Sequence, residues 1–188
     1  GFRGEVDEQR WANKAMAQVK TFTERWDVTV QPLMVEKGLE AQLGSGIVLY
    51  AKADRVDREA DGNLHIVDYK TGNKPPETDW TQLFLQALVL SRRQSAPVDR
   101  ASFLYLGPSA METTSISPDV LDGALWELLR TARKVRQESK YRATPGTWCG
   151  YCDFTPICTA RGGEATPSSA PEGQLELWDY GLEEADDP

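Results

Sequence analysis

The chain has 188 residues, of which 40% are hydrophobic, and its formal net charge is −8. This length and composition predict one folded domain with a hydrophobic core and exclude a wholly disordered chain. No apolar run reaches the about 18 residues of a membrane span, and the N-terminus lacks a signal-peptide pattern. We therefore expect a cytoplasmic protein with no membrane partner.

The acidic residues are concentrated at one end of the chain. Residues 162–188 contain eight acids and no Lys or Arg, which leaves residues 1–161 close to neutral. A nucleic-acid partner is compatible with this distribution, because local patches set phosphate binding. The basic stretch at 130–142 is such a patch, although a solvated helix face is the commoner meaning of a charge run. Its candidate DNA-binding residues are Arg130, Arg133, Lys134 and Arg136.

Hydrophobic periodicity predicts the helices and strands. The predicted helices cover 5–26, 79–93 (with Asp79 as N-cap) and 118–140. The predicted strands cover 28–36, 46–59, 63–70, 100–107 and 111–117. The order helix, three strands, helix, two strands, helix is typical of an α/β or α+β fold in which helices are layered on a sheet.

The strand over 63–70 ends in an acid and a base that share a face, Asp68 and Lys70. Asp54, on the preceding strand, shares its face with Lys52 and Val56 if that strand alternates regularly. Asp54 and Asp68 can cooperate only if the hairpin register brings them together. The alternative interpretation is a surface ion-pair network, which is the usual meaning of an Asp-x-Lys pattern taken alone.

The length of the hairpin loop decides the register. A two-residue Asp61-Gly62 turn would put the two acids on opposite faces. A three-residue loop, 60–62 with Gly62 in the left-handed conformation, would put Asp54 opposite Asp68. We prefer the three-residue loop, because it also pairs the apolar residues of the two strands, and it places Asp57 opposite His65.

Two adjacent carboxylates repel each other unless a cation lies between them or one is protonated. Oxygen ligands of this kind favour Mg²⁺ or Mn²⁺, which often also bind substrate phosphate. The ammonium of Lys70 can hold or help deprotonate an attacking water and offset the charge that builds on phosphorus. The pattern therefore favours phosphodiester hydrolysis.

Four segments in this order resemble a known family. They are "ADRVD" (53–57), "IVDYKTG" (66–72), "QLFLQALVL" (82–90) and a Cys-x2-Cys-x5-Cys pattern. Together they resemble the RecB-type branch of the PD-(D/E)XK nucleases, especially iron–sulfur forms such as AddB/AdnB-like domains and stand-alone RecB-family exonucleases. The resemblance implies a restriction-endonuclease-like core with a mixed sheet flanked by helices, and a Mg²⁺- or Mn²⁺-dependent, exonuclease-like activity on DNA ends or single strands.

The resemblance also implies roles for individual residues. Asp54 and Asp68 would be metal ligands, Lys70 the catalytic lysine, and Gln82 a glutamine facing the site. Glu36 matches an acid often found on the first strand of the family. The family commonly has Tyr four residues after the glutamine, where this chain has Gln86, so a substrate contact is expected to differ.

Two family features are missing, a His on an N-terminal helix and an upstream cysteine that completes the cluster. The only His is His65, on the other face of its strand, and no cysteine precedes Cys149. We expect a fragment that lacks its N-terminal segment, which would supply both groups. The alternative is a degenerate, catalytically inactive domain that binds DNA or a helicase, or a scaffold that only bridges proteins.

The cysteines have the spacing of metal or cluster ligands: Cys149, Cys152 and Cys158. From spacing alone, zinc with an external fourth ligand is favoured, and three unliganded thiols are an alternative. The resemblance favours a [4Fe–4S] cluster with a structural role.

The acidic tail contains "QLELW" (174–178), which resembles the peptide by which bacterial replication and repair proteins bind the sliding clamp. The anchor residues would be Gln174, Leu175, Leu177 and Trp178. A solubilising tail, or one that covers the DNA groove, is the alternative. The predicted organisation is an N-terminal helix (1–27), a nuclease core (28–144), a cluster-binding segment (145–161) and the flexible tail (162–188).

Overall fold

The computed structural model describes residues 4–44 and 46–163. The helices are α1 (Glu5–Arg25), α2 (Thr81–Arg93) and α3 (Pro118–Gln137), and the strands are β1 (Met34–Gly44), β2 (Ile47–Arg58), β3 (Leu64–Lys70), β4 (Val98–Tyr105) and β5 (Ala110–Ser115). This confirms the predicted order of elements. Three short 3-10 helices follow, at Thr147–Tyr151, Thr155–Ile157 and Thr159–Arg161. The chain divides into two compact units, Gly1–Gln137 and Glu138–Pro188.

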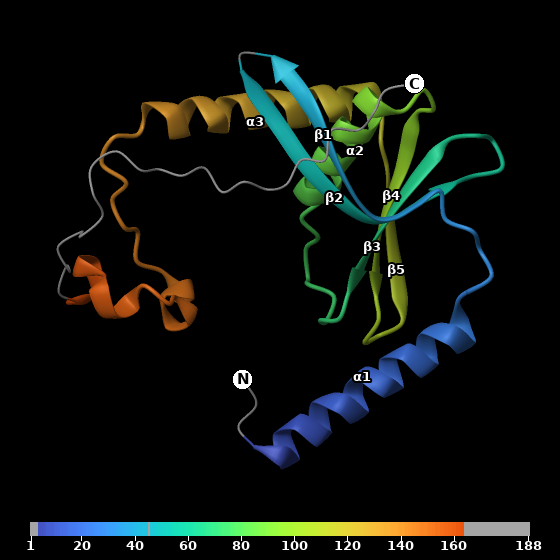
Figure 1. Cartoon of the computed structure of the whole chain (residues 1–188), viewed down its shortest axis with the longest axis horizontal. Coiled ribbons are helices and arrows are strands. Elements are labelled where there is room, and N and C mark those ends of the chain that lie inside the picture. Colours follow the sequence, from blue (N-terminus) through green and yellow to red (C-terminus); the bar gives the residue numbers. More distant parts are fainter. Residues whose placement is uncertain (1–3, 45, 164–188) are drawn as a thin grey trace. The chain divides into compact units, whose positions relative to one another are not determined.

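The five strands form one mixed sheet in the order β1-β2-β3-β4-β5 (Figure 1). Neighbouring strands are antiparallel, except that β3 and β4 are parallel. The parallel pair requires a crossover, which α2 supplies. α2 contacts β1 to β4, and α3 packs on α2. The mixed α+β sheet with flanking helices confirms the predicted fold class.

The hydrophobic core lies between α2 and the sheet. It contains Val56 and Ile66, which face each other across β2 and β3, together with Leu83 and Leu90 of α2. These four side chains are almost fully buried, and burial of each contributes roughly 1.5–3 kcal/mol to folding. The core thus fixes α2 against the two strands that carry the acids.

The first predicted strand is placed wrongly. The sequence pattern put it at 28–36, but β1 runs from Met34 to Gly44, beyond the predicted end. Val28 and Val30 alternate as in a strand, yet both side chains are exposed and neither residue pairs with β2. The position of β1 is decided by its pairing with β2. The alternating apolar residues before Pro32 have no partner strand, so they do not form part of the sheet.

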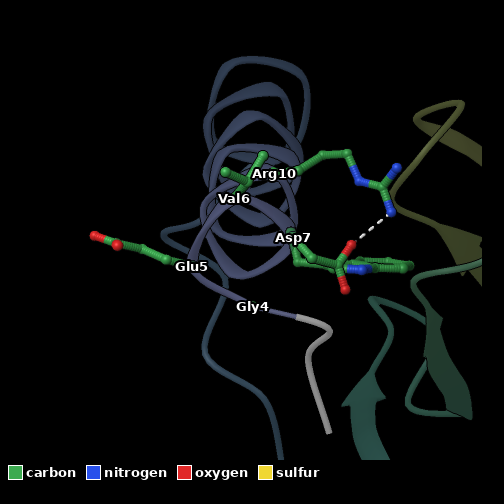
Figure 2. A pocket seen from close by; sticks show the side chains of 6 residues that line it. Gly4, Glu5, Val6, Asp7 and Arg10 are labelled. Atoms are coloured by element: carbon green, nitrogen blue, oxygen red, sulfur yellow. Dashed lines mark hydrogen bonds and ion pairs between the residues drawn. The ribbon is translucent and has the colours of Figure 1, made fainter.

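α1 is joined to the rest of its unit by a few contacts near its C-terminal half. Phe22 packs edge-on against Tyr69, and Gln18 Nε2 donates a hydrogen bond to Thr71 O at 3.0 Å. The N-terminal turn of α1 has a shallow hollow, where Asp7 and Arg10 form an ion pair (Figure 2). Residues of this one segment line the hollow, so it brings no separate elements together.

Within the residues that the structure describes, no helix is both long enough and apolar enough to cross a membrane.

Candidate active site

The hairpin between β2 and β3 has the three-residue loop that the sequence predicts. Glu59 N donates to Asn63 O at 2.9 Å, and Gly62, with φ +89°, donates its N–H to Glu59 O at 2.9 Å. Val56 therefore pairs with Ile66, and Asp57 with His65. Continued by two residues, this register places Asp54 across from Asp68.

The ladder between β2 and β3 ends just before the two acids, with the pair Arg55 and Val67. Beyond it, the Asp54 side chain takes over, because its Oδ2 accepts a hydrogen bond from Tyr69 N at 3.0 Å. The carboxylate satisfies a backbone N–H that no longer has a strand partner. Asp54 is thereby fixed beside Asp68 at the point where the strands separate.

The faces of β2 do not alternate regularly through Asp54, which corrects the sequence-based assignment. Val56 and Ala53 are both buried in the core, so two residues, not one, separate two inward-facing positions. Lys52 lies on the exposed side, contrary to the expectation that it shares a face with Val56. The residue of β1 at the level of Asp54 is Glu36. The residues before and after it pair with β2, but Glu36 itself does not, and its φ is +52°. Both strands are therefore irregular at the level of Asp54.

The Asp68 carboxylate is only 3% exposed and lies in a closed set of contacts with Lys70 and Gln82. Lys70 Nζ is 2.6 Å from Asp68 Oδ1, and Gln82 Nε2 donates to Asp68 Oδ2 at 2.7 Å. Lys70 Nζ also donates to Gln82 Oε1 at 3.0 Å. Because Gln82 is on α2, the helix orients both the acid and the base of β3.

Burial raises the pKa of Asp68 above its ordinary value. Lys70 and Gln82 oppose this rise, while the charge of Asp54 adds to it. Among the described residues, buried Oδ1 accepts no hydrogen bond of good geometry, although the Lys70 ammonium is close. An ionised carboxylate in this position has unused capacity to bind a cation.

Two carboxylates form the candidate metal site. The described part of the chain contains no group of three or more His, Cys, Asp or Glu side chains that could hold an ion. Mg²⁺ commonly takes one or two protein carboxylates and fills its remaining positions with water and substrate phosphate. The oxygen donors of Asp54 and Asp68, one of them buried and poorly satisfied, therefore fit Mg²⁺ or Mn²⁺.

Glu36 lies at the level of Asp54 but its carboxylate interacts elsewhere. Its side chain is 58% exposed, and Oε2 lies 2.5 Å from Lys52 Nζ. Its predicted part in the site stays a prediction.

Gln86 is a residue whose role the sequence pattern did not reveal. It is 4% exposed, and its Nε2 donates to Lys52 O on β2 at 3.0 Å. Gln82, one turn earlier on α2, contacts β3. The two glutamines therefore connect one helix to both acid-bearing strands, and their i, i+4 spacing is the signal that could have indicated this.

We expect Gln86→Met to change the unfolding free energy by less than about 1 kcal/mol, because the lost hydrogen bond is offset by removal of the buried, unpartnered Oε1. Binding of a divalent cation at Asp54 and Asp68 is expected to weaken roughly tenfold, because β2 and hence Asp54 lose an attachment. Urea unfolding and Mn²⁺ titration measure the two effects. Gln94→Met, at the exit of α2, is the control. Equal Mn²⁺ affinity of the Gln86 and Gln94 variants would refute the role.

His65 is a buried structural residue. Its Nδ1 lies 2.9 Å from Glu59 Oε1, and its Nε2 lies 2.7 Å from Ser102 Oγ. Asp57 is opposite His65 as predicted, but its carboxylate pairs with Arg55. None of these contacts involves the acids of the candidate site.

The four basic candidates lie on α3, and two have partners on the protein. Arg130 pairs with Glu127 and lies over the Trp126 ring, and Arg136 donates to Gly46 O at 2.9 Å. A role of these four residues in phosphate binding stays a prediction.

The cysteines lie in the second unit and are not disulfide-bonded. Cys149 Sγ accepts a hydrogen bond from Gly146 N at 3.3 Å. Within residues 4–44 and 46–163 the three thiols are not brought together as a group that could hold a metal, so the cluster and the zinc site stay predictions. The motif at 174–178 lies outside the described residues.

Comparison with known proteins gives one family match. A model described as "PD-(D/E)XK nuclease superfamily" matches residues 3–159, which include every helix and strand labelled in Figure 1. No curated protein matches the chain. A solved structure described as "Crystal structure of SSO0001" is 15% identical, covering 83% of this chain and 75% of that chain, with a TM-score of 0.46.

Proposed function

Because this chain belongs to the PD-(D/E)XK nuclease superfamily, we propose that it is a Mg²⁺- or Mn²⁺-dependent deoxyribonuclease of the exonuclease type, which acts in DNA repair, recombination or defence. The observation that carries the proposal is the buried Asp68 carboxylate, held beside Asp54 by the hairpin register and in contact with Lys70 and Gln82. The oxygen atoms of Asp54 and Asp68 are suitable ligands for a divalent cation. The raised pKa of Asp68 reflects its burial, which distinguishes it from a carboxylate in a solvated ion pair.

Each residue of the site has a distinct part in the proposed reaction. Asp54 and Asp68 would hold the divalent ion, which when bound supplies positive charge for the phosphate and lowers the pKa of a bound water. Lys70, whose Nζ lies beside the Asp68 carboxylate, would donate a hydrogen bond to the attacking water or to a phosphate oxygen and would offset charge in the transition state. Gln82 keeps the Lys70 and Asp68 side chains in their relative orientation.

The direct test is degradation of single-stranded and blunt-ended DNA by the full chain with Mg²⁺, Mn²⁺ or EDTA, compared with Asp54→Asn. Metal-dependent cutting that the variant loses, with DNA binding retained, supports the enzyme. Binding without cutting by the wild-type chain would indicate the alternative, an inactive nuclease-like module that holds DNA or a helicase.

Charge reversal on α3 tests the proposed DNA contact. We expect Arg133→Glu combined with Lys134→Glu to weaken DNA binding and to flatten its salt dependence, because fewer counterions are then released. Fluorescence anisotropy at several salt concentrations measures both. Reversal of two acids of the same helix, Asp119→Lys with Asp122→Lys, is the matched control, and an unchanged salt slope in the first variant would contradict the contact.

The cysteine spacing carries a separate prediction, a [4Fe–4S] cluster whose fourth ligand lies outside this chain, with zinc as the alternative. A protein purified without oxygen is expected to be brown and to absorb near about 400 nm. Colourless protein with stoichiometric zinc would decide for zinc, and protein with neither would leave unliganded thiols. The tail motif adds a proposed sliding-clamp contact.

A further inference from the structure

One face of α3 carries exposed charged residues that are arranged symmetrically about a single tryptophan. Trp126 is 62% exposed. Asp119 and Asp122 lie seven and four residues before it, Arg133 and Arg130 lie seven and four residues after it, and all four are exposed. Spacings of three, four and seven residues return to the same face of a helix, so these side chains form one stripe. The stripe is acidic on one side of Trp126 and basic on the other.

The helix macrodipole explains only part of this arrangement. It favours acids in the first turn of a helix and bases in the last turn, and its effect falls off beyond those turns. Asp119 lies in the first turn of α3, whereas Asp122 and Arg130 lie outside both terminal turns. The macrodipole also gives no reason for an exposed Trp126 at the centre of the stripe.

Most charges of the stripe have no partner of opposite charge within the protein. Among the residues that the structure describes, neither of the two acids nor Arg133 forms an ion pair. Arg130 pairs with Glu127, and its guanidinium carbon lies 5.4 Å from the centre of the Trp126 ring. A second stripe with the opposite order of charges would therefore complement this one.

An apolar groove of about 730 Å³ lies between α2 and α3, beside the stripe. Phe84 and Leu85 of α2 and Leu128 of α3 contribute to its lining. Gly123 borders the groove one turn before Trp126, and a Cβ added to it would meet nothing within 4 Å. Glycine is unfavourable in a helix interior, but here it leaves space beside the groove. A large side chain that approaches the stripe from outside can use this space.

We propose that α3 pairs with α3 of a second copy of the chain, antiparallel and about a two-fold axis that passes near Trp126. Asp119 then lies opposite Arg133 of the second copy, Asp122 lies opposite its Arg130, and the symmetry repeats both pairs. The Trp126 ring of each copy enters the apolar groove of the other. An aromatic anchor in a pocket, surrounded by charged pairs, is the usual anatomy of a protein interface.

The dimer is expected to be weak. A single pair of helices lies at the small end of protein interfaces, so we expect a dissociation constant on the order of 100 µM. The chain is then monomeric at the lower concentrations of DNA-binding and unfolding measurements, in which variants of α3 serve as controls. Association is measured without DNA, because phosphates would compete for the basic half of the stripe.

Sedimentation equilibrium of the full chain, from well below to well above this constant, measures the association. The wild type is expected to form dimers. Asp119→Lys with Asp122→Lys makes the whole stripe basic, and Arg130→Glu with Arg133→Glu makes it acidic. Each of these variants alone should associate about 100-fold more weakly or less, because like charges then face each other.

An equimolar mixture of the two variants should associate about as well as the wild type, because a basic stripe then faces an acidic one. Both variants keep a net negative charge, so attraction between whole molecules does not explain this result. Glu5→Lys with Glu8→Lys, at exposed positions of α1, is the matched control and should dimerise like the wild type.

Three results would overturn the proposal. They are a wild type that stays monomeric well above about 100 µM, stripe variants that each dimerise as well as the wild type, and a mixture that does not associate. None of these measurements depends on whether the chain cuts DNA.

Discussion

Replacement of Asp68 by Asn is expected to lower DNA cleavage by about 1,000-fold or more while raising the melting temperature of the metal-free protein at neutral pH. Cleavage falls because a neutral amide is a weaker ligand for Mg²⁺, and loss of several kcal/mol of transition-state stabilisation corresponds to this factor. Stability rises because the wild-type protein must keep an ionised carboxylate in an almost fully buried position.

The pH dependence of this difference follows from the raised pKa of Asp68. The folded protein holds this proton more tightly than the unfolded chain, whose Asp pKa is about 3.9. The contribution of Asp68 to stability is therefore greatest below that value and is lost as pH rises toward the pKa of the folded state. Asn does not titrate, so the advantage of the variant should shrink as pH falls toward about 4.

Thermal unfolding of wild type and variant from about pH 4 to 8, with and without Mg²⁺, measures these effects. Mg²⁺ should raise the melting temperature of the wild type and not that of Asp68→Asn, because it binds the folded site. Asp122→Asn, at an exposed position of α3, should behave as wild type in every condition. If Asp68→Asn is less stable than wild type at pH 7 without metal, the inference that the buried, ionised Asp68 carboxylate destabilises the metal-free fold is wrong.

Replacement of Lys70 by Met is expected to lower cleavage by about 100-fold or more and also to destabilise the fold. The cleavage loss follows from removal of the positive charge that faces the reacting phosphate. The protein loses stability because the buried Asp68 charge loses its cation. Broken buried pairs cost 3–5 kcal/mol, and we expect about 1–3 here because the Lys70 side chain is partly solvated.

A double-mutant cycle separates the charge pair from ordinary packing. Combined with Asp68→Asn, Lys70→Met should cost much less stability than it does alone, because no buried charge remains unpaired. Lys52→Met, which breaks the exposed pair with Glu36, should change stability little. Urea unfolding measures the four proteins of the cycle and the Lys52→Met control. If Lys70→Met and Lys52→Met have the same effect, the Asp68–Lys70 pair does not stabilise the fold.

The register of the two acids could be predicted because the chemistry of a short loop determines it. Gly62 tolerates the positive φ that the third position of the loop requires, and the pairing of Val56 with Ile66 supplied an independent check. The helices were also predictable, since α2 and α3 both carry apolar residues at helical spacing. Those of α2 are buried, whereas no residue of α3 is more than partly buried.

The irregularity at Asp54 could not be predicted in the same way. Glu36 adopts φ +52° although it is not glycine, so its sequence carries no sign of an unusual backbone. The change of face between Ala53 and Val56 depends on packing against α2, to which Gln86 contributes through Lys52 O. Such tertiary contacts override the period of two that a strand pattern assumes.

The hairpin loop at residues 60–62 also restricts how the gene can change in evolution. Surface loops usually accept insertions and deletions. Here an insertion would only lengthen the loop, since the pairs from Arg55 to Arg58 could stay as they are. A one-residue deletion would leave a two-residue connection, which can keep those pairs only if its two residues suit a type I′ or II′ turn. Descendants of this sequence should therefore gain residues in this loop more freely than they lose one.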